Sequence, residues 1–271
     1  MHIKRYFLFF LSLILCYFYL PSVAGKTILT TDAINSPPKF FVNDKGELDG
    51  LVMSIINEIE KINNQLEFIF RVPSSSIFVP LKRSIADIKN QEIDILFGLA
   101  RTQSRIDQGL IFIDIPLYEV RNVIAVVKDD EISVNNMKEI EYLHNHNTVL
   151  TMAGSGMNDF LNKFELKSDD SGKSVEQNLQ KLVRGRGRFF YYNAIGMNFE
   201  INRLGFSDRV KVLPGAFRTY KHYIALKKGT NESIISPLTD SLKALKENGR
   251  LKEIYLNYTT SLPSNQFIDD E

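Results

Sequence analysis

The stretch IDILFGLARTQSR, residues 93–105, gives the main indication of the fold. It opens as a mainly apolar run, typical of a strand buried in a sheet, and that run stops at Gly98. Arg101 and Arg105 follow. Ligands of open α/β sheets bind where strands end, and a guanidinium matches a carboxylate in a bidentate fashion. We predict that this strand delivers Arg105 to a carboxylate in a cleft, whereas Arg101 fits a solvated surface charge equally well.

Strand and helix patterns alternate on both sides of this stretch, which favours α/β bodies, each with a mixed, mostly parallel sheet flanked by helices. The pattern restarts after the apolar run at 122–130, so we predict two such bodies joined by strand-like crossings near residues 126 and 221. The predicted strands are 26–31, 66–70, 93–98, 122–130, 148–154, 188–193, 210–214 and 222–228. The predicted helices are 51–63, 79–91, 135–143, 157–164, 174–185, 194–205 and those within 235–258.

The first 24 residues have the pattern of a cleavable secretory signal. Lys4 and Arg5 precede an apolar run at 7–20, and small residues at 22–24 follow Pro21. A transmembrane anchor is the competing interpretation, but the run is shorter than the roughly 20 apolar residues that span a bilayer. We expect cleavage after Ala24 and a periplasmic protein.

Composition narrows the classes of function. The 271 residues include 33 basic and 32 acidic side chains, a net charge of +1, so no basic surface for nucleic acid is expected. The single cysteine, Cys16, lies in the predicted signal after Leu15, which is too large for a lipid-anchoring site. The mature chain is therefore expected to have no disulfide and no thiolate chemistry.

Two further strand ends carry small or polar residues. Gly154, Ser155 and Gly156 separate a predicted strand from a helix, where free N–H groups suit an anion, although Ser155 is also a plausible helix cap. Asp159 stands where a dinucleotide fingerprint needs glycine, so no nicotinamide or other cofactor is expected. Asn193 ends the strand at 188–193, after arginines that we interpret as solvated.

Signals for catalysis or metal binding are poor. His144, His146 and His222 have no cysteine or carboxylate partner at metal-ligand spacing, so no metal site is expected. No serine stands in a nucleophile elbow. Asp87 and Asp94 fit structural roles better than those of a general acid and base, so no catalytic residue is predicted.

Three segments together resemble the family-3 periplasmic solute-binding proteins of polar amino-acid ABC transporters: SPPKFFVNDKGELDG (36–50), residues 87–130 and residues 220–258. The most specific part is the order Asp94, Gly98, Thr102, Arg105, Pro116 and Tyr118. The resemblance implies a two-lobed clamshell with two strand-like hinge crossings. Lobe one would contain 25–126 plus 221–260, lobe two 127–220, and 261–271 would be a flexible tail.

The same resemblance implies a ligand site. Arg105 would bind the ligand α-carboxylate, assisted by the main chain at Gly98 and Ala100 and, from lobe two, by Ser155 and Gly156. Leu81 would form an apolar wall, with Phe78 and Arg83 as neighbours on the same helix.

Two departures concern the ligand. Ser36 stands where an aromatic side chain usually stacks on the ligand, and Asn193 stands where an aspartate usually binds its ammonium group. Without that carboxylate, either another acid binds the ammonium or the ligand is not a standard α-amino acid.

The function implied is capture of a small carboxylate-bearing ligand by hinge closure, for delivery to permease subunits in the membrane. We expect a monomer that binds no nucleic acid. Two alternatives remain: a ligand-sensing module with a separate signalling partner, and an enzyme of the cyclohexadienyl dehydratase kind, which needs an acid in the cleft.

Overall fold

The computed structural model describes residues 25–71, 76–144, 147–153, 155 and 157–259. The predicted signal at 1–24 and the predicted tail at 261–271 lie outside these residues. None of the helices described is long and apolar enough to cross a membrane.

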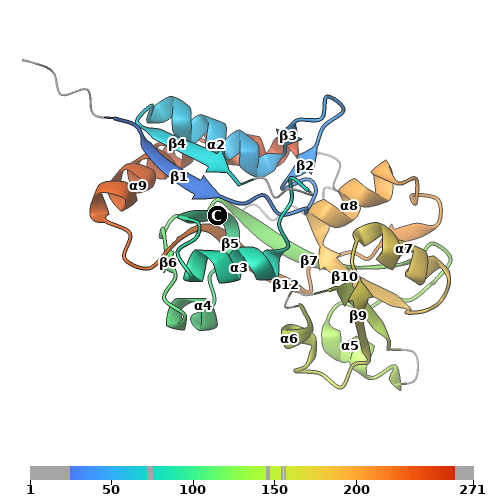
Figure 1. Ribbon diagram of the computed structural model, residues 1–271. Helices are drawn as coiled ribbons and strands as arrows, with labels where there is room; N and C mark the ends of the chain where they lie inside the picture. Colours follow the sequence, from blue (N-terminus) through green and yellow to red (C-terminus); the bar gives the residue numbers. More distant parts are fainter. Residues whose placement is uncertain (1–24, 72–75, 145–146, 154, 156, 260–271) are drawn as a thin grey trace, which may run out of the picture.

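The chain forms two α/β bodies that lie side by side (Figure 1). The first contains β1 (Thr27–Thr31), β2 (Phe41–Val42), β3 (Leu48–Asp49), α2 (Leu51–Ile62), β4 (Leu66–Phe70), α3 (Leu81–Lys89), β5 (Ile95–Ala100), α4 (Gln103–Asp107), β6 (Ile111–Phe112), α9 (Glu232–Glu247) and α10 (Arg250–Asn257). The second contains α5 (Met137–Glu141), β8 (Val149–Met152), α6 (Met157–Leu161), β9 (Ser168–Gly172), α7 (Val175–Val183), β10 (Phe189–Asn193), α8 (Ala194–Arg203) and β11 (Val210–Val212).

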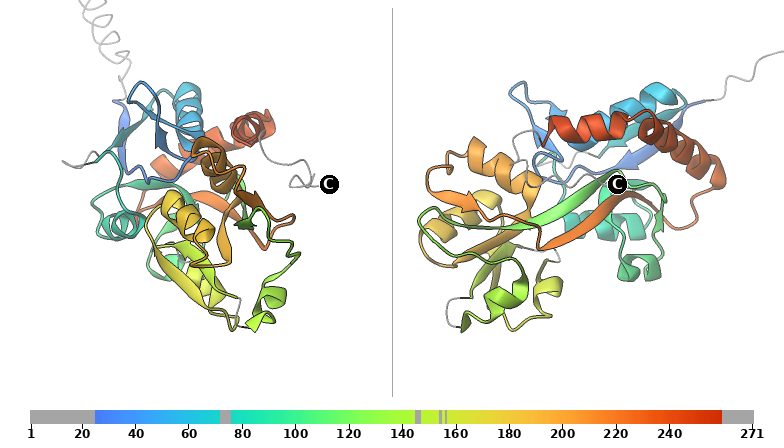
Figure 2. Two further views of the ribbon diagram at one scale, coloured as in Figure 1. Left: turned by 90° about the vertical axis from the view of Figure 1, so that its right-hand side faces the viewer. Right: turned by 180° about the vertical axis from the view of Figure 1, so that it is seen from behind.

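Two long strands, β7 (Tyr118–Val127) and β12 (Arg218–Leu226), run between the bodies, as the view from behind in Figure 2 shows. They pair antiparallel, from Tyr118 opposite His222 to Asn122 opposite Arg218. These strands are the two predicted strand-like crossings. The pairing of β7 with β12 lies before the predicted position near residue 126, where Val126 pairs with Lys211 of the second body. They extend one sheet through both bodies, in the order β5-β12-β7-β10-β8-β9.

The hydrophobic core is divided in the same way. One buried cluster joins α2, β4, β5 and α9 through residues such as Ile55 and Leu242, and another joins β7, β8, α7 and β10 through residues such as Leu150 and Phe190. The two bodies therefore each have a core of their own. The lobe boundaries at 126 and 220 stay predictions.

The sheets contain both parallel and antiparallel pairs, in agreement with the predicted mixed sheet. Parallel pairing joins β1 to β4, β8 to β10 and β8 to β9. Antiparallel pairing joins β5 to β12, β12 to β7 and β7 to β10. The chain leaves the first body along β7 and returns along β12, so these two strands run in opposite directions. Their direction depends on the path of the chain, which strand patterns do not reveal.

Local sequence explains most element boundaries. The stripe of Leu51, Ile55 and Ile59 is buried along α2, as the helical period requires. The predicted helix at 79–91 begins at Leu81 because Pro80 is its N-cap residue. Sequence patterns missed β2, β3, α4, β6 and β9. The polar β9, SDDSG, has no strand propensity of its own, and pairing with β8 sets its conformation.

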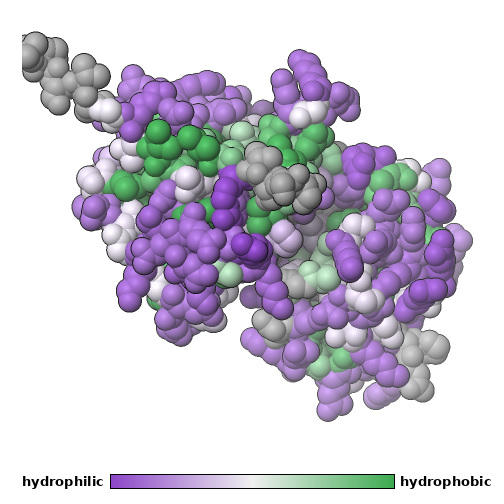
Figure 3. Space-filling model, in the orientation of Figure 1, coloured by the Kyte–Doolittle hydropathy of each residue, from purple (hydrophilic) through white to green (hydrophobic). Residues whose placement is uncertain are grey.

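The face in Figure 3 is largely hydrophilic, with hydrophobic residues gathered over β1 and β4. Ile28 is 54% exposed and Ile69 44% exposed on this two-stranded sheet. The paired register places both side chains on one face of the sheet, opposite the face that packs on α2.

Candidate functional site

A cleft of about 400 Å³ is lined by residues of both bodies. The first body contributes the end of β5 with Arg105 and two segments, 34–39 and 78–81. The second contributes the ends of β8 and β10 together with Ser155 and Lys173. Tyr220 and His222 of the crossing strand β12 also line the cleft. The site therefore lies where strands end, between bodies that the crossing strands connect.

Arg105 is held at the cleft by backbone contacts. It lies in the short helix α4, whose N-cap Thr102 accepts a hydrogen bond from the Arg105 backbone N–H. Its Nη1 donates to the carbonyl oxygen of Ala100 at 2.6 Å. Burial lowers the pKa of Arg105, but a guanidinium stays charged in proteins. Among the described residues its other guanidinium nitrogens have no hydrogen-bond partner, so they can donate to an anion.

Lys39 is a second cation in the cleft, and sequence analysis gave it no role in binding. Its Nζ donates to the carbonyl oxygen of Gly98 at 2.9 Å. Burial, and to a smaller extent the nearby Arg105 guanidinium, lowers the pKa of Lys39 to about 7. Its position between Pro38 and two phenylalanines was the available signal, because a lysine set among apolar residues is unusual on an exposed loop.

Gly98 permits this approach of Lys39. Its φ is +69°, a conformation that favours glycine, and a Cβ there would lie 2.6 Å from both Lys39 Cε and the Tyr118 hydroxyl. The glycine that ends the predicted strand is therefore required both by the backbone conformation and by the lysine packed over it.

His222 completes the basic cluster of the first body. Its Nδ1 lies 3.1 Å from the Tyr118 hydroxyl. Burial, followed by the charges of Lys39 and Arg105, lowers the pKa of His222 well below its usual value, so the ring is neutral at pH 7. Burial raises the pKa of Tyr118, which keeps that hydroxyl protonated. Both groups can therefore act as neutral hydrogen-bonding partners.

Asn193 and Ser155 serve as local caps in the second body. The Asn193 Oδ1 accepts a hydrogen bond from the Gly196 N–H at 2.8 Å at the start of α8. The Ser155 Oγ accepts from the Met157 N–H at 3.3 Å. Both side chains line the cleft, so capping and exposure to a ligand coincide.

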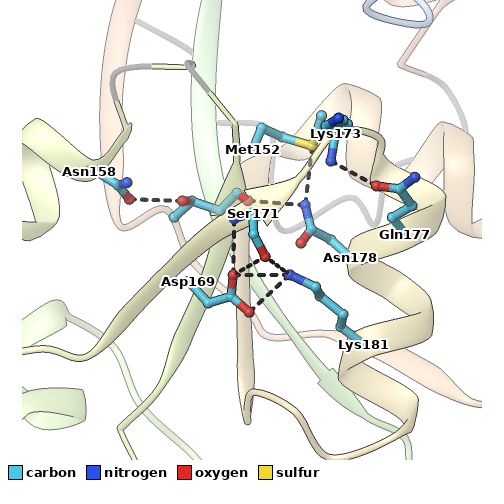
Figure 4. A network of polar contacts seen from close by, with 9 residues as sticks. Met152, Asn158, Asp169, Ser171, Lys173, Gln177, Asn178 and Lys181 are labelled. Atoms are coloured by element: carbon cyan, nitrogen blue, oxygen red, sulfur yellow. Dashed lines mark hydrogen bonds and ion pairs between the residues drawn. The ribbon is translucent and has the colours of Figure 1, made fainter.

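Lys173 is positioned by the packing of β8, β9 and α7, shown in Figure 4. Its backbone N–H donates to the Gln177 side chain at 2.9 Å. Nearby, the Asn178 amide donates to the backbone of β8, and Lys181 pairs with Asp169 of β9 at 2.9 Å. These contacts fix the turn that carries Lys173 to the cleft, where its side chain is exposed.

Most of the residues predicted for the ligand site lie together in the cleft. The cleft lining includes Ser36, Phe78, Leu81, Gly98, Ala100, Arg105, Ser155 and Asn193. Gly156 lies outside the described residues. Contact of these residues with a ligand stays a prediction.

Two details differ from expectation. Phe78 precedes α3 instead of lying on it, because that helix begins at Leu81. Arg83 is absent from the described lining of the cleft: its side chain is 66% exposed, and its Nε donates to Asp87 at 2.8 Å.

Arg101, Arg188 and Asp94 form ion pairs and are absent from the described lining of the cleft. Arg101 contacts Asp114 at 2.7 Å, and Arg188 contacts Asp130 with two hydrogen bonds. Asp94 accepts from Thr30 and pairs with Lys227. Within the described ranges, no group of three or more histidine, cysteine or acidic side chains is arranged to hold a metal ion.

Comparison with known proteins identifies the family. The model of the bacterial extracellular solute-binding proteins, family 3, matches residues 28–261. The chain belongs to this family. Residues 28–261 include both bodies and both crossing strands, so family membership covers the whole cleft.

Relatives in the family bind amino acids. The L-cystine-binding protein TcyJ of Bacillus subtilis is 21% identical over 85% of this chain and 82% of its own. A probable histidine-binding protein of Neisseria gonorrhoeae is 25% identical over 86% and 83%. The structure of an ancestral arginine-binding protein bound to glutamine has a TM-score of 0.69 at 20% identity, over 85% of this chain and 97% of that one. The fold is therefore that of the two-lobed periplasmic binding proteins.

Proposed function

We propose that this member of family 3 is an exported protein that captures a small carboxylate-bearing ligand, an amino acid or related organic acid, for an ABC importer. Arg105 binds the carboxylate from the first body. Contacts from the second body, through Ser155 and Asn193, form when the two bodies close about the crossing strands. Binding energy then shifts the population toward the closed form, because the ligand touches both bodies only there.

The arrangement of Arg105 carries this proposal. A guanidinium that lines a cleft, anchored through one nitrogen to a backbone carbonyl, has its other donors available in a fork that suits a carboxylate. The predicted signal at 1–24 supports export, and the amino-acid ligands of the relatives support the ligand class.

A thermal-shift screen of amino acids, organic acids and aromatic acids tests the proposal, since a ligand that binds only the native state raises the melting temperature. Arg105→Ala is expected to abolish the shift of any hit and to weaken its binding at least roughly 30-fold, because a charged partner is left unpaired.

Arg101→Ala is the matched control, because Arg101 lies just before α4 but pairs with Asp114. It should leave binding unchanged. Undiminished binding by Arg105→Ala would refute the carboxylate role. Turnover of prephenate or arogenate by the purified protein would favour the dehydratase alternative.

A further inference from the structure

The charges that line the cleft all have one sign among the residues that the structure describes. Lys39 and Arg105 come from the first body and Lys173 from the second, and no aspartate or glutamate accompanies them in the described lining. A zwitterionic ligand needs an anionic or carbonyl partner for its ammonium group. The lining therefore suits a ligand with an excess of negative charge.

Lys39 and Arg105 lie close enough to repel each other. Their side chains donate to the carbonyls of Gly98 and Ala100, two residues whose Cα atoms are at most about 7 Å apart along the chain. Burial, and then the Arg105 charge, lowers the pKa of Lys39, and burial followed by both cations lowers that of His222. A cation removed from water is costly unless an opposite charge compensates it, and neutral carbonyls compensate only in part.

Asn193 removes the negative charge that an aspartate would bring to an ammonium group. Its Oδ1 already accepts a hydrogen bond from the Gly196 N–H. A neutral amide compensates the charge of an ammonium group less than a carboxylate does. The residue that replaces the usual aspartate therefore makes this side of the cleft less favourable to a cationic group.

We propose that the cleft selects a small acid with two anionic groups and no ammonium group, one bound by Arg105 and the other by Lys39. This inference rests on the proposed function, since it specifies the ligand of the same cleft. A short-chain dicarboxylate is the simplest such acid, because it carries two anionic groups and no ammonium group.

Matched pairs of acids that differ only by an amino group test the selection directly. Titration calorimetry at pH 6.5, where Lys39 is largely charged, compares succinate with aspartate and glutarate with glutamate. We expect at least one dicarboxylate to bind ten-fold or more tightly than its amino counterpart. Equal or tighter binding of the amino acids would overturn the inference and leave the proposed function intact. The same holds if other acids bind in an Arg105-dependent manner and no dicarboxylate binds.

Variants of Lys39 test the second anionic contact. Lys39→Gln keeps a donor for the Gly98 carbonyl and removes the charge, and it should weaken dicarboxylate binding ten-fold or more while leaving the weaker binding of butyrate unchanged. Lys45→Met is the control, because Lys45 is exposed in the turn between β2 and β3. Unchanged dicarboxylate binding by Lys39→Gln would overturn the role of Lys39. If no acid of any class binds in an Arg105-dependent manner, the proposed function itself fails.

Discussion

Lys39 shows how one residue defines the electrostatics of the cleft. Its stem packs over Gly98 and its ammonium group donates to a backbone carbonyl, so the charge lies in a poorly solvated position. Burial, and to a smaller extent Arg105, lowers the pKa of Lys39 to about 7, and a bound carboxylate would raise it again. The ligand-free protein is therefore destabilised by a group that ligand binding stabilises.

The stability of the ligand-free protein should depend on this lysine above pH 7. The pKa of Lys39 is 10.5 in the unfolded chain and about 7 in the folded protein. Between these values the unfolded state binds more protons, so the free energy of unfolding rises with pH. Urea denaturation between pH 7 and about 9 should show this rise, and Lys39→Met should flatten it.

The groups that face Lys39 do not produce the same rise. Arg105 stays charged, the pKa values of Tyr118 and Tyr220 are raised, and that of His222 is lowered. Lys45→Met, at an exposed site, should keep the slope of the native protein. An identical slope in Lys39→Met would show that Lys39 does not titrate in this range.

At the scale of the element, β5 departs from regular geometry where it reaches the cleft. Its pairing with β12 shifts register between Tyr223 and Ala225, next to Gly98 with its positive φ. A bulge of this kind re-aims the residues that follow it. The strand therefore ends with the carbonyls of Gly98 and Ala100 at positions where Lys39 and Arg105 reach them.

The substitution Gly98→Ala tests the importance of this close approach, and Gly185→Ala is its control. Both Gly98 and Gly185 have φ of +69°, but a Cβ meets nothing within 4 Å at Gly185. Gly185→Ala should lower the free energy of unfolding by roughly 1–2 kcal/mol, the cost of the left-handed conformation. Gly98→Ala should cost more, because Lys39 and Tyr118 must move, and it should also weaken ligand binding. Equal losses in urea denaturation would show that the close approach is unimportant.

In the whole molecule, each body has its own core, and the crossing strands β7 and β12 connect the bodies. The bodies also touch where Phe41 of β2 packs against Phe199 of α8. Asn122 of β7 donates to Tyr191 of β10 at 2.9 Å, so the crossing is tied to the second body at its centre. Closure can then change the angle between two rigid bodies while both cores stay intact.

A ligand that contacts both bodies should make the protein more compact. We expect small-angle X-ray scattering to show a smaller radius of gyration when a hit from the thermal-shift screen is added at saturation. Arg105→Ala at the same ligand concentration should show no change. A constant radius of gyration for the native protein with bound ligand would contradict capture by hinge closure.

Local patterns were sufficient to predict much of the fold and part of the candidate site. The stripe of α2, the buried run of β10 and the apolar start of β5 follow from periodicity and burial, and a strand end followed by Arg105 indicated the cleft. The polar strand β9 and the antiparallel direction of the crossing strands were not predictable, since both depend on pairing between distant segments.

Patterns within short stretches of the chain predicted the alternation of strands and helices, the two bodies and the arginine at the strand end, because each depends on residues near one another. The contact of Lys39 with the carbonyl of Gly98, 59 positions away in the sequence, forms only in the folded chain. The same is true of the positions of Tyr220 and His222 in the cleft. Residues from segments far apart in the sequence together set the charge of a binding site. Only folding brings them close enough to interact electrostatically.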